Sequence, residues 1–477
     1  MTGVHADKRW WALTLLCIGE LMIVLDTTIV NVALPSIRSD LGFTETSLVW
    51  VVNAYMLTYG GCLLLGGRLG DLFGQRRLFL LGTTLFTLAS LVCGIAQSQG
   101  LLVTARAVQG LGGAVVSAVA LSLMMNLFPE PTERAKAMGV YGFVCAGGGS
   151  IGVLLGGLLT STLSWHWIFL VNLPIGVAVY GCCMALLPDD ARAGGSQKLD
   201  VGGAVTITLA LMVAVYAIVD GNEAGWRSTQ TLGLLAAAIV LLALFLWIEV
   251  RVVHPLVPLA LFRLRSVTVS NIVGVLWAAA MFAWFFISAL YMQIVLGYSA
   301  MQVGLAFLPS NLIMAVLSLG WSAKLVMRFG IRGPLAAGLV MAALGLALFA
   351  RAPVHGDFWV DVLPGMLLLG IGAGVALNPV LLAAMSEVGP SESGLASGVV
   401  NTAFMMGGAL GLAVLASGAA ARTDALSTAG APLQVALHGG YQLAFGCGAL
   451  FAALAAALSF LLLRGIAPGQ TEPQPVA

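Results

Sequence analysis

The chain has 477 residues, of which 60% are hydrophobic and only 9% are Asp, Glu, Lys or Arg. A soluble globular protein carries about 25% charged residues, so the composition excludes a soluble fold and predicts an all-α polytopic membrane protein. The formal net charge of +1 argues against a nucleic-acid partner, which requires a clustered basic face.

Fourteen membrane-spanning helices are predicted from the spacing of charged residues. A span needs about 20 apolar residues. The uncharged stretches 137–188 and 266–323 hold 52 and 58 residues, enough for two spans each. With turns placed at Gly, Pro and polar clusters, the span centres fall near Ile23, Leu57, Leu88, Val115, Leu154, Val177, Ala210, Ile239, Ala280, Met314, Ala342, Ile371, Gly408 and Ala453.

Basic residues predict the orientation in the membrane. If the N-terminus is inside, sixteen of the 21 Lys and Arg residues lie in inner loops and tails, and four lie in outer loops. Arg106 lies within a span. Because Lys and Arg concentrate in cytoplasmic loops, both termini are expected to be cytoplasmic.

Two inner loops indicate an internal repeat. Residues 66–77 (GGRLGDLFGQRR) follow the second span, and residues 323–332 (AKLVMRFGIR) follow the tenth. Superposing Gly74 on Gly330 gives an offset of 256 residues. This offset exceeds the length of a six-helix unit by about two spans. The expected organisation is an N-terminal six-helix bundle (1–188), a linker with two inserted helices (189–265) and a C-terminal six-helix bundle (266–477). Internal repeats of this kind are typical of secondary transporters.

Six strings in chain order carry a family resemblance. They are LDTTIVNVALP (25–35), GGRLGDLFGQRR (66–77), RAVQGLGGA (106–114), GGSIGVLLGG (148–157), WHWIFLVNLPIG (165–176) and YMQIVLGYS (291–299). Together they resemble the major facilitator superfamily, and within it the fourteen-helix drug:proton antiporters of the EmrB/QacA type. The resemblance implies the major facilitator fold and the inner membrane of a bacterium. Two residues depart from its motifs: Val153 replaces a usual Pro, and His166 replaces a usual Arg.

Three ionisable residues lie deep within spans: Glu20 and Asp26 in the first, and Arg106 in the fourth. Each costs about 2.5–3.5 kcal/mol on insertion scales, so each is a functional candidate. Asp26 and Arg106 have similar depths, and the resemblance connects the Arg106 motif with proton handling. Burial favours a protonated Asp26 and a nearby Arg106 favours the ionised form, so a modest movement could switch its protonation. A static ion pair is the alternative.

Glu20 lies six positions before Asp26, about 240° around the helix, so the two are expected on different faces. It is a candidate second proton site or a counter-charge for a cationic substrate. A position in an aqueous inner vestibule is the alternative.

The resemblance also assigns roles to two glycine-containing segments. A conformational latch that stabilises the outward-facing state corresponds to Gly67, Arg68, Asp71, Gly74, Arg76 and Arg77, for which a simple role in topology is the alternative. The antiporter motif of the fifth span corresponds to Gly148, Gly152, Gly156 and Gly157.

The substrate cavity is expected to combine aromatic walls with uncharged polar groups. Aromatic side chains suit flat, lipophilic and cationic molecules. The candidates are Asn53, Tyr55, Trp277, Phe282, Trp284, Phe285, Tyr291, Asn378 and Asn401. For the aromatic residues, packing or contact with lipid is the alternative.

The sequence therefore predicts a proton-coupled exporter of lipophilic, cationic drugs or toxic compounds, acting as a monomer in lipid. The same fold exporting an endogenous metabolite, such as a peptide, amino acid or fatty acid, is the alternative. No nucleotide-binding loop GxxxxGK[ST] occurs, and the five His residues are too dispersed to indicate an enzyme. No cofactor and no metal site are expected.

Overall fold

The computed structural model describes residues 6–128, 130–186, 200–252, 255–388 and 393–463, and these segments contain helices and connecting loops without any β-strand. The first half holds α1 (Ala6–Leu41), α2 (Val49–Phe73), α3 (Gln75–Gly94), α4 (Gln99–Leu127), α5 (Pro131–Thr162), α6 (Trp167–Leu170) and α7 (Asn172–Leu186). Two further helices follow, α8 (Val201–Ala224) and α9 (Thr229–Arg251).

The second half is also helical and includes several non-α turns. Its α-helices are α10 (Arg265–Leu290), α11 (Ala300–Val316), α12 (Ser322–Phe329), α13 (Arg332–Arg351), α14 (Leu363–Met385), α15 (Ser393–Thr428) and α16 (Leu433–Leu462). A 3₁₀ turn, η1 (Leu259–Arg263), precedes α10. Three π-helical turns are η2 (Tyr291–Val295), η3 (Leu317–Trp321) and η4 (Phe358–Val362).

Length and composition test the predicted spans. Among the described residues, twelve helices are long and apolar enough to cross a membrane. Every expected span centre falls in a different helix, but two of these helices, α5 and α11, are not among the twelve. The all-helical class is confirmed, and length and composition identify twelve candidate spans among the described residues, so the count of fourteen stays a prediction.

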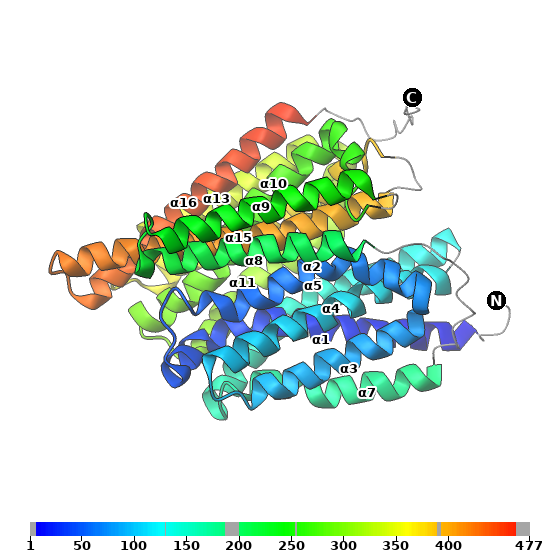
Figure 1. Cartoon of the computed structure of the whole chain (residues 1–477), viewed down its shortest axis with the longest axis horizontal. Helices are drawn as coiled ribbons and strands as arrows, with labels where there is room; N and C mark the ends of the chain where they lie inside the picture. Colours follow the sequence, from blue (N-terminus) through cyan, green and yellow to red (C-terminus); the bar gives the residue numbers. More distant parts are fainter. Residues whose placement is uncertain (1–5, 129, 187–199, 253–254, 389–392, 464–477) are drawn as a thin grey trace.

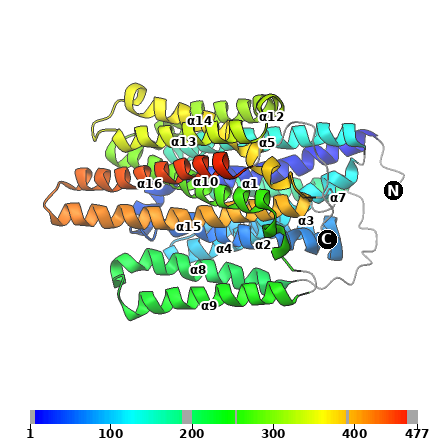
Figure 2. The ribbon, with the colours of Figure 1, turned by 90° about the horizontal axis from the view of Figure 1, so that it is seen from above.

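The two halves lie side by side, with α1–α7 in one and α10–α16 in the other (Figure 1). They meet where α2 packs against α15 and where α5 packs against α11. The pair α8 and α9 lies at the edge of the molecule, with α9 outermost (Figure 2). Since α8 contacts both α2 and α15, the inserted pair covers one junction between the halves.

Hydrogen bonds tie the halves together at the end of the molecule where α1 leads into α2. The described residues form three of them: Asn53 Nδ2 to the Ala409 carbonyl (2.8 Å), Gln293 Nε2 to the Val32 carbonyl (2.9 Å) and the Tyr441 hydroxyl to Glu45 Oε1 (3.1 Å). The start of α1 and the end of α16 both lie toward the opposite end (Figure 1).

The two loops expected to be repeats have equivalent backbone turns. Gly74 separates α2 from α3 with φ +98°, and Gly330 separates α12 from α13 with φ +74°. Only glycine adopts such angles without steric cost. Both halves therefore use a glycine to break one helix and start the next.

Candidate functional site

A buried ion pair joins α1 to α4 in the first half. Arg106 Nη1 lies 2.5 Å from Asp26 Oδ2, and the two side chains are 1% and 0% exposed. Each charge would be strongly unfavourable alone in such surroundings, so each depends on the other and on further hydrogen bonds.

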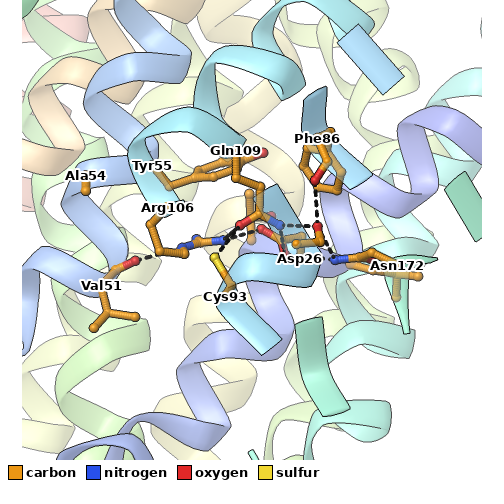
Figure 3. A network of polar contacts seen from close by, with 12 residues as sticks. Asp26, Val51, Ala54, Tyr55, Phe86, Cys93, Arg106, Gln109 and Asn172 are labelled. Atoms are coloured by element: carbon orange, nitrogen blue, oxygen red, sulfur yellow. Dashed lines mark hydrogen bonds and ion pairs between the residues drawn. The ribbon is translucent and has the colours of Figure 1, made fainter. Parts of the chain in front are cut away.

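Gln109 connects both members of this pair (Figure 3). Its Oε1 accepts a hydrogen bond from Arg106 Nη1 at 2.7 Å, and its Nε2 donates to Asp26 Oδ1 at 2.7 Å. Arg106 and Gln109 are three residues apart on α4, which places them on one face of the helix. The amide therefore holds the carboxylate and the guanidinium in a fixed relative position.

Two more helices contribute to the network around Asp26. Asn172, at the start of α7, donates to Asp26 Oδ1 at 3.1 Å. Ser90 of α3 accepts from Gln109 Nε2 at 2.8 Å and from Asn172 Nδ2 at 3.4 Å. Three donors thus converge on the Asp26 carboxylate from α4 and α7, while Ser90 supports two of them.

The Arg106 guanidinium is also held on its other sides. Its Nε donates to the Val51 carbonyl of α2 at 2.9 Å. The Tyr55 ring lies 4.4 Å from Arg106 Cζ, and the Phe169 ring lies 5.6 Å from it. A cation over aromatic faces gains electrostatic stabilisation in a water-poor site. The charge is therefore compensated by hydrogen bonds from α1, α2 and α4 and by rings from α2 and α6.

Sequence reasoning identified Asp26, Arg106 and Tyr55 but missed the uncharged members Ser90, Gln109 and Asn172. The signal was present, because Gln109 and Asn172 both stand within the motif strings already identified. An amide inside an apolar span requires a partner, which could have pointed to both residues.

Glu20 lies outside this network, as its position around the helix predicted. It is 6% exposed, and its Oε2 accepts a hydrogen bond from Ser117 of α4 at 2.8 Å. It forms no ion pair with a described Lys or Arg, so its charge is uncompensated by any cation in that part of the chain.

The glycines of the fifth-span motif lie at two helix contacts. A Cβ on Gly148, Gly152 or Gly156 would meet atoms of α1, and for Gly156 the distance to the Ile29 carbonyl oxygen would be 2.7 Å. A Cβ on Gly157 would instead lie 2.8 Å from the Ala300 carbonyl oxygen in the other half. The motif therefore brings α5 close to both α1 and α11.

Latch candidates are described only in part. The side chains of Arg68 and Asp71 lie outside the described residues. Gly67 lies within α2, and Arg77 is exposed near the start of α3. Arg76 donates from Nη2 to the Met184 carbonyl at 2.9 Å, which links α3 to the end of α7.

Most aromatic cavity candidates of α10 pack inside the second half. Trp277 and Trp284 are 1% and 3% exposed. The Trp284 ring centroid lies 5.6 Å from that of Phe307 and 6.4 Å from that of Phe349. Phe285 stacks on Phe307 at 5.5 Å. In this conformation these contacts are packing contacts among α10, α11 and α13.

The remaining cavity candidates do not converge on one place. Phe282 packs against Phe404 of α15 at 5.9 Å, and Asn53 also bonds to α15. The Tyr291 hydroxyl donates to the Pro353 carbonyl, Asn378 donates to the Ser318 carbonyl, and Asn401 is exposed.

Comparison with known proteins identifies the family of the chain. The model of the Major Facilitator Superfamily matches residues 16–412. Puromycin resistance protein pur8 of Streptomyces alboniger is 40% identical, covering 96% of this chain and 92% of that protein. Cephamycin export protein CmcT of Amycolatopsis lactamdurans is 38% identical, covering 98% of this chain and 96% of that protein. Multidrug resistance protein Stp of Mycobacterium tuberculosis is 37% identical, covering 86% and 76%.

Solved structures show the same fold at low identity. An auto-inhibited peptide transporter of the POT family aligns with a TM-score of 0.68 at 16% identity, covering 97% of this chain and 99% of that chain. An inward-facing bacterial homologue of the human lysosomal transporter Spinster aligns with a TM-score of 0.64 at 16% identity, covering 97% and 98%.

Proposed function

Since the chain belongs to the major facilitator superfamily, we propose that it is an antiporter that exchanges protons for lipophilic, cationic small molecules by alternating access. It is an efflux transporter in the membrane rather than an enzyme, in line with its antibiotic and multidrug resistance relatives. The buried network around Asp26 and Arg106 is the observation that carries the proton-coupling part of this proposal.

Asp26 is the proposed proton acceptor. When a proton from the outer side binds its carboxylate, the negative charge that faces Arg106 disappears and the attraction between α1 and α4 weakens. Release of that proton to the cytoplasm restores the ion pair. Because Arg106 also donates to the Val51 carbonyl of α2, and α2 packs against α15, loss of the ion pair affects a helix that contacts the other half.

Glu20 is proposed as a second proton site or as the counter-charge for a cationic substrate. Its burial without a described cationic partner supports both roles, since a buried carboxylate is stabilised either by a proton or by a cation. The cavity itself is proposed to lie between the halves, where Asn53 of α2 and Phe282 of α10 contact α15. Tyr55 of α2, which packs on Arg106, is proposed to connect the cavity to the ion pair.

The energy of the proton gradient is sufficient for export. One proton that crosses with the membrane potential releases about 2.3 kcal/mol per 100 mV, before any pH difference is added. An exported metabolite in place of a drug is the second candidate. The names of the relatives, which concern puromycin resistance, cephamycin export and multidrug resistance, favour the drug over the metabolite.

We propose fourteen spans, with α5 and the continuous run α11–η3–α12 added to the twelve apolar helices. The 32 residues of α5 exceed the length of a span. The proposed bundles are residues 1–188 and 266–477, joined by 189–265. A monomer in the bacterial inner membrane with both termini in the cytoplasm would then expose the Glu45 end of the bundle outside.

Two segments with family motifs, one around the α2–α3 junction and one in α5, also have proposed roles. Gly67, Arg68, Asp71, Gly74, Arg76 and Arg77 are proposed to form the latch of the outward-facing state. The glycines Gly148, Gly152, Gly156 and Gly157 are proposed to let α5 move closely along α1 and α11, which their short approach distances support.

Efflux of a fluorescent lipophilic cation from proteoliposomes tests the function. An imposed pH gradient is expected to drive efflux by the unmodified protein, and Asp26→Asn is expected to abolish gradient-driven efflux while retaining dye binding. Absence of movement by the unmodified protein would contradict drug export and favour the metabolite. Equal movement of the dye by both proteins would support export but show that coupling does not depend on Asp26, and Glu20 would then be the candidate for proton coupling.

A further inference from the structure

An apolar groove runs along the outside of the second half between α13 and α16. It has a volume of about 850 Å³ and is lined mainly by Ala and Gly, from Gly333 to Ala347 on α13 and from Ala449 to Phe460 on α16. Fourteen residue steps on α13 give a length of about 21 Å. That length exceeds half of the hydrocarbon core, about 15 Å, so the groove can take one acyl chain of a single leaflet.

Large apolar side chains on the groove remain uncovered by the rest of the protein. Leu344 and Leu450 are 54% and 56% exposed, and Phe460 is 51% exposed. Both helices are among the apolar helices long enough to span a membrane. The groove therefore opens toward lipid rather than toward the interior of the molecule.

A cation stands at one end of this groove. Arg332 immediately precedes Gly333, and its Cζ lies 4.1 Å from the centre of the Phe460 ring, which also lines the groove. The Nε of Arg332 is buried and has no hydrogen-bond partner in the described part of the chain. The Arg332 side chain as a whole is only partly buried and forms no ion pair with a described residue, so its guanidinium can donate to an acceptor outside the chain.

The charge around Arg332 is positive. Arg332 is the first residue of α13, where the helix dipole adds a partial positive charge. Arg328, four residues earlier, is exposed. Glu387 lines a neighbouring pocket together with Ile331, but its Oε2 accepts from the Ser266 amide at 3.1 Å and it forms no ion pair with Arg332.

We propose that this groove binds an anionic phospholipid, with one acyl chain along α13 and α16 and the phosphate accepting from Arg332. The apolar lining matches the chain, and the guanidinium with its unused donor matches phosphate oxygens. The occupant is therefore a lipid of the leaflet at the Arg332 end. A second copy of this protein is the other occupant of an apolar groove, and the test below detects it as a dimer that excludes lipid.

Lipid binding to the delipidated full-length protein in detergent, measured by native mass spectrometry, tests this assignment. Phosphatidylglycerol is compared with phosphatidylcholine of the same acyl chains and with inorganic phosphate. We expect tighter binding of phosphatidylglycerol than of phosphatidylcholine, and no retained inorganic phosphate. Equal binding of both lipids, or retention of phosphate alone, would overturn the proposal, as would a dimer that excludes lipid.

Three variants separate the two parts of the lipid. Arg332→Gln is expected to weaken phosphatidylglycerol binding about tenfold, as for loss of a charge-assisted hydrogen bond. The matched control Arg328→Gln keeps the groove and Arg332, and should weaken phosphatidylglycerol binding much less than Arg332→Gln does. Ala453→Phe fills the exposed groove and should weaken binding of both lipids. Equal effects of Arg332→Gln and Arg328→Gln, or unchanged binding by a folded Ala453→Phe protein, would refute the site.

Discussion

At the scale of single residues, the Asp26 carboxylate depends on two amides as well as on Arg106. Gln109 bonds to both charges, at 2.7 Å each, and Asn172 adds a third donor to Asp26 at 3.1 Å. In a water-poor site such a network is strong only when every member is satisfied. The amides therefore decide how easily the ion pair can separate.

Replacing Gln109 with Met should destabilise the protein by about 1–3 kcal/mol, because buried polar groups lose their partner without gaining water. Thermal unfolding in detergent measures this loss. Ser90→Ala is the matched control: Ser90 contacts the amides and not Asp26, so a smaller effect is expected. Equal losses in the two variants would contradict the bridging role of Gln109.

A double variant separates proton coupling from a static ion pair. Arg106→Met alone leaves Asp26 buried without its cation and should cost about 3–5 kcal/mol. Adding Asp26→Asn removes the orphaned charge, so thermal stability should largely recover. Transport driven by a pH gradient should not recover, because no group remains to carry the proton. If the double variant transports at the normal rate, the pair is only structural.

At the scale of elements, α5 is a tightly packed helix. It runs without interruption through Val153, where the family motif usually has Pro, so no proline kink is imposed. Its glycine positions differ in the room they leave: a Cβ on Gly152 would overlap Thr28, whereas a Cβ on Gly149 would lie 3.9 Å from Thr28 Cγ2.

These two glycines provide a matched test of helix packing. Gly152→Ala should destabilise by about 1–3 kcal/mol through overpacking between α5 and α1. Gly149→Ala should be neutral or stabilising by up to about 1 kcal/mol, since alanine favours helix and meets no clash. Thermal unfolding compares the two. Equal destabilisation would show that the close contact between α1 and α5 does not require glycine at position 152.

The helices also show which features of the fold could be predicted from the sequence. Span centres fell inside helices because a run of apolar residues has few alternatives in lipid. The repeat was visible through glycines such as Gly74 and Gly330, whose backbone angles exclude most other residues. The surroundings of individual side chains were harder to predict, because the sequences of apolar helices show little alternation of polar and apolar residues. Trp284, for example, was expected in the cavity and packs inside the second half.

At the scale of the whole molecule, Glu45 joins the halves. Its Oε1 accepts from Arg38 at 2.9 Å and from the Tyr441 hydroxyl of α16 at 3.1 Å, and its side chain is 16% exposed. Burial raises the pKa of the Glu45 carboxyl, Arg38 and Tyr441 oppose this, and Asp424 adds to it. Burial outweighs the two hydrogen-bond partners, so the protonated carboxyl is favoured at this position.

A raised pKa fixes the sign of the pH dependence. The contribution of the protonated carboxyl to this contact is complete below the ordinary carboxyl pKa and is lost as the pH rises through the raised value. We expect the distance between spin labels on the α1–α2 loop and α16 to lengthen as the pH rises. Glu45→Gln, which mimics the neutral carboxyl, should remain closed across the range. A Glu45→Gln protein with the same pH response would exclude Glu45 as the titrating group.

Proton release on substrate binding tests the central claim most directly. Purified protein in weakly buffered detergent is mixed with a lipophilic cation while the bulk pH is recorded. Exchange of substrate for a proton on Asp26 predicts acidification with the unmodified protein and none with an Asp26→Asn protein that still binds the cation. Binding without any acidification, or equal acidification by both proteins, would contradict proton exchange at Asp26.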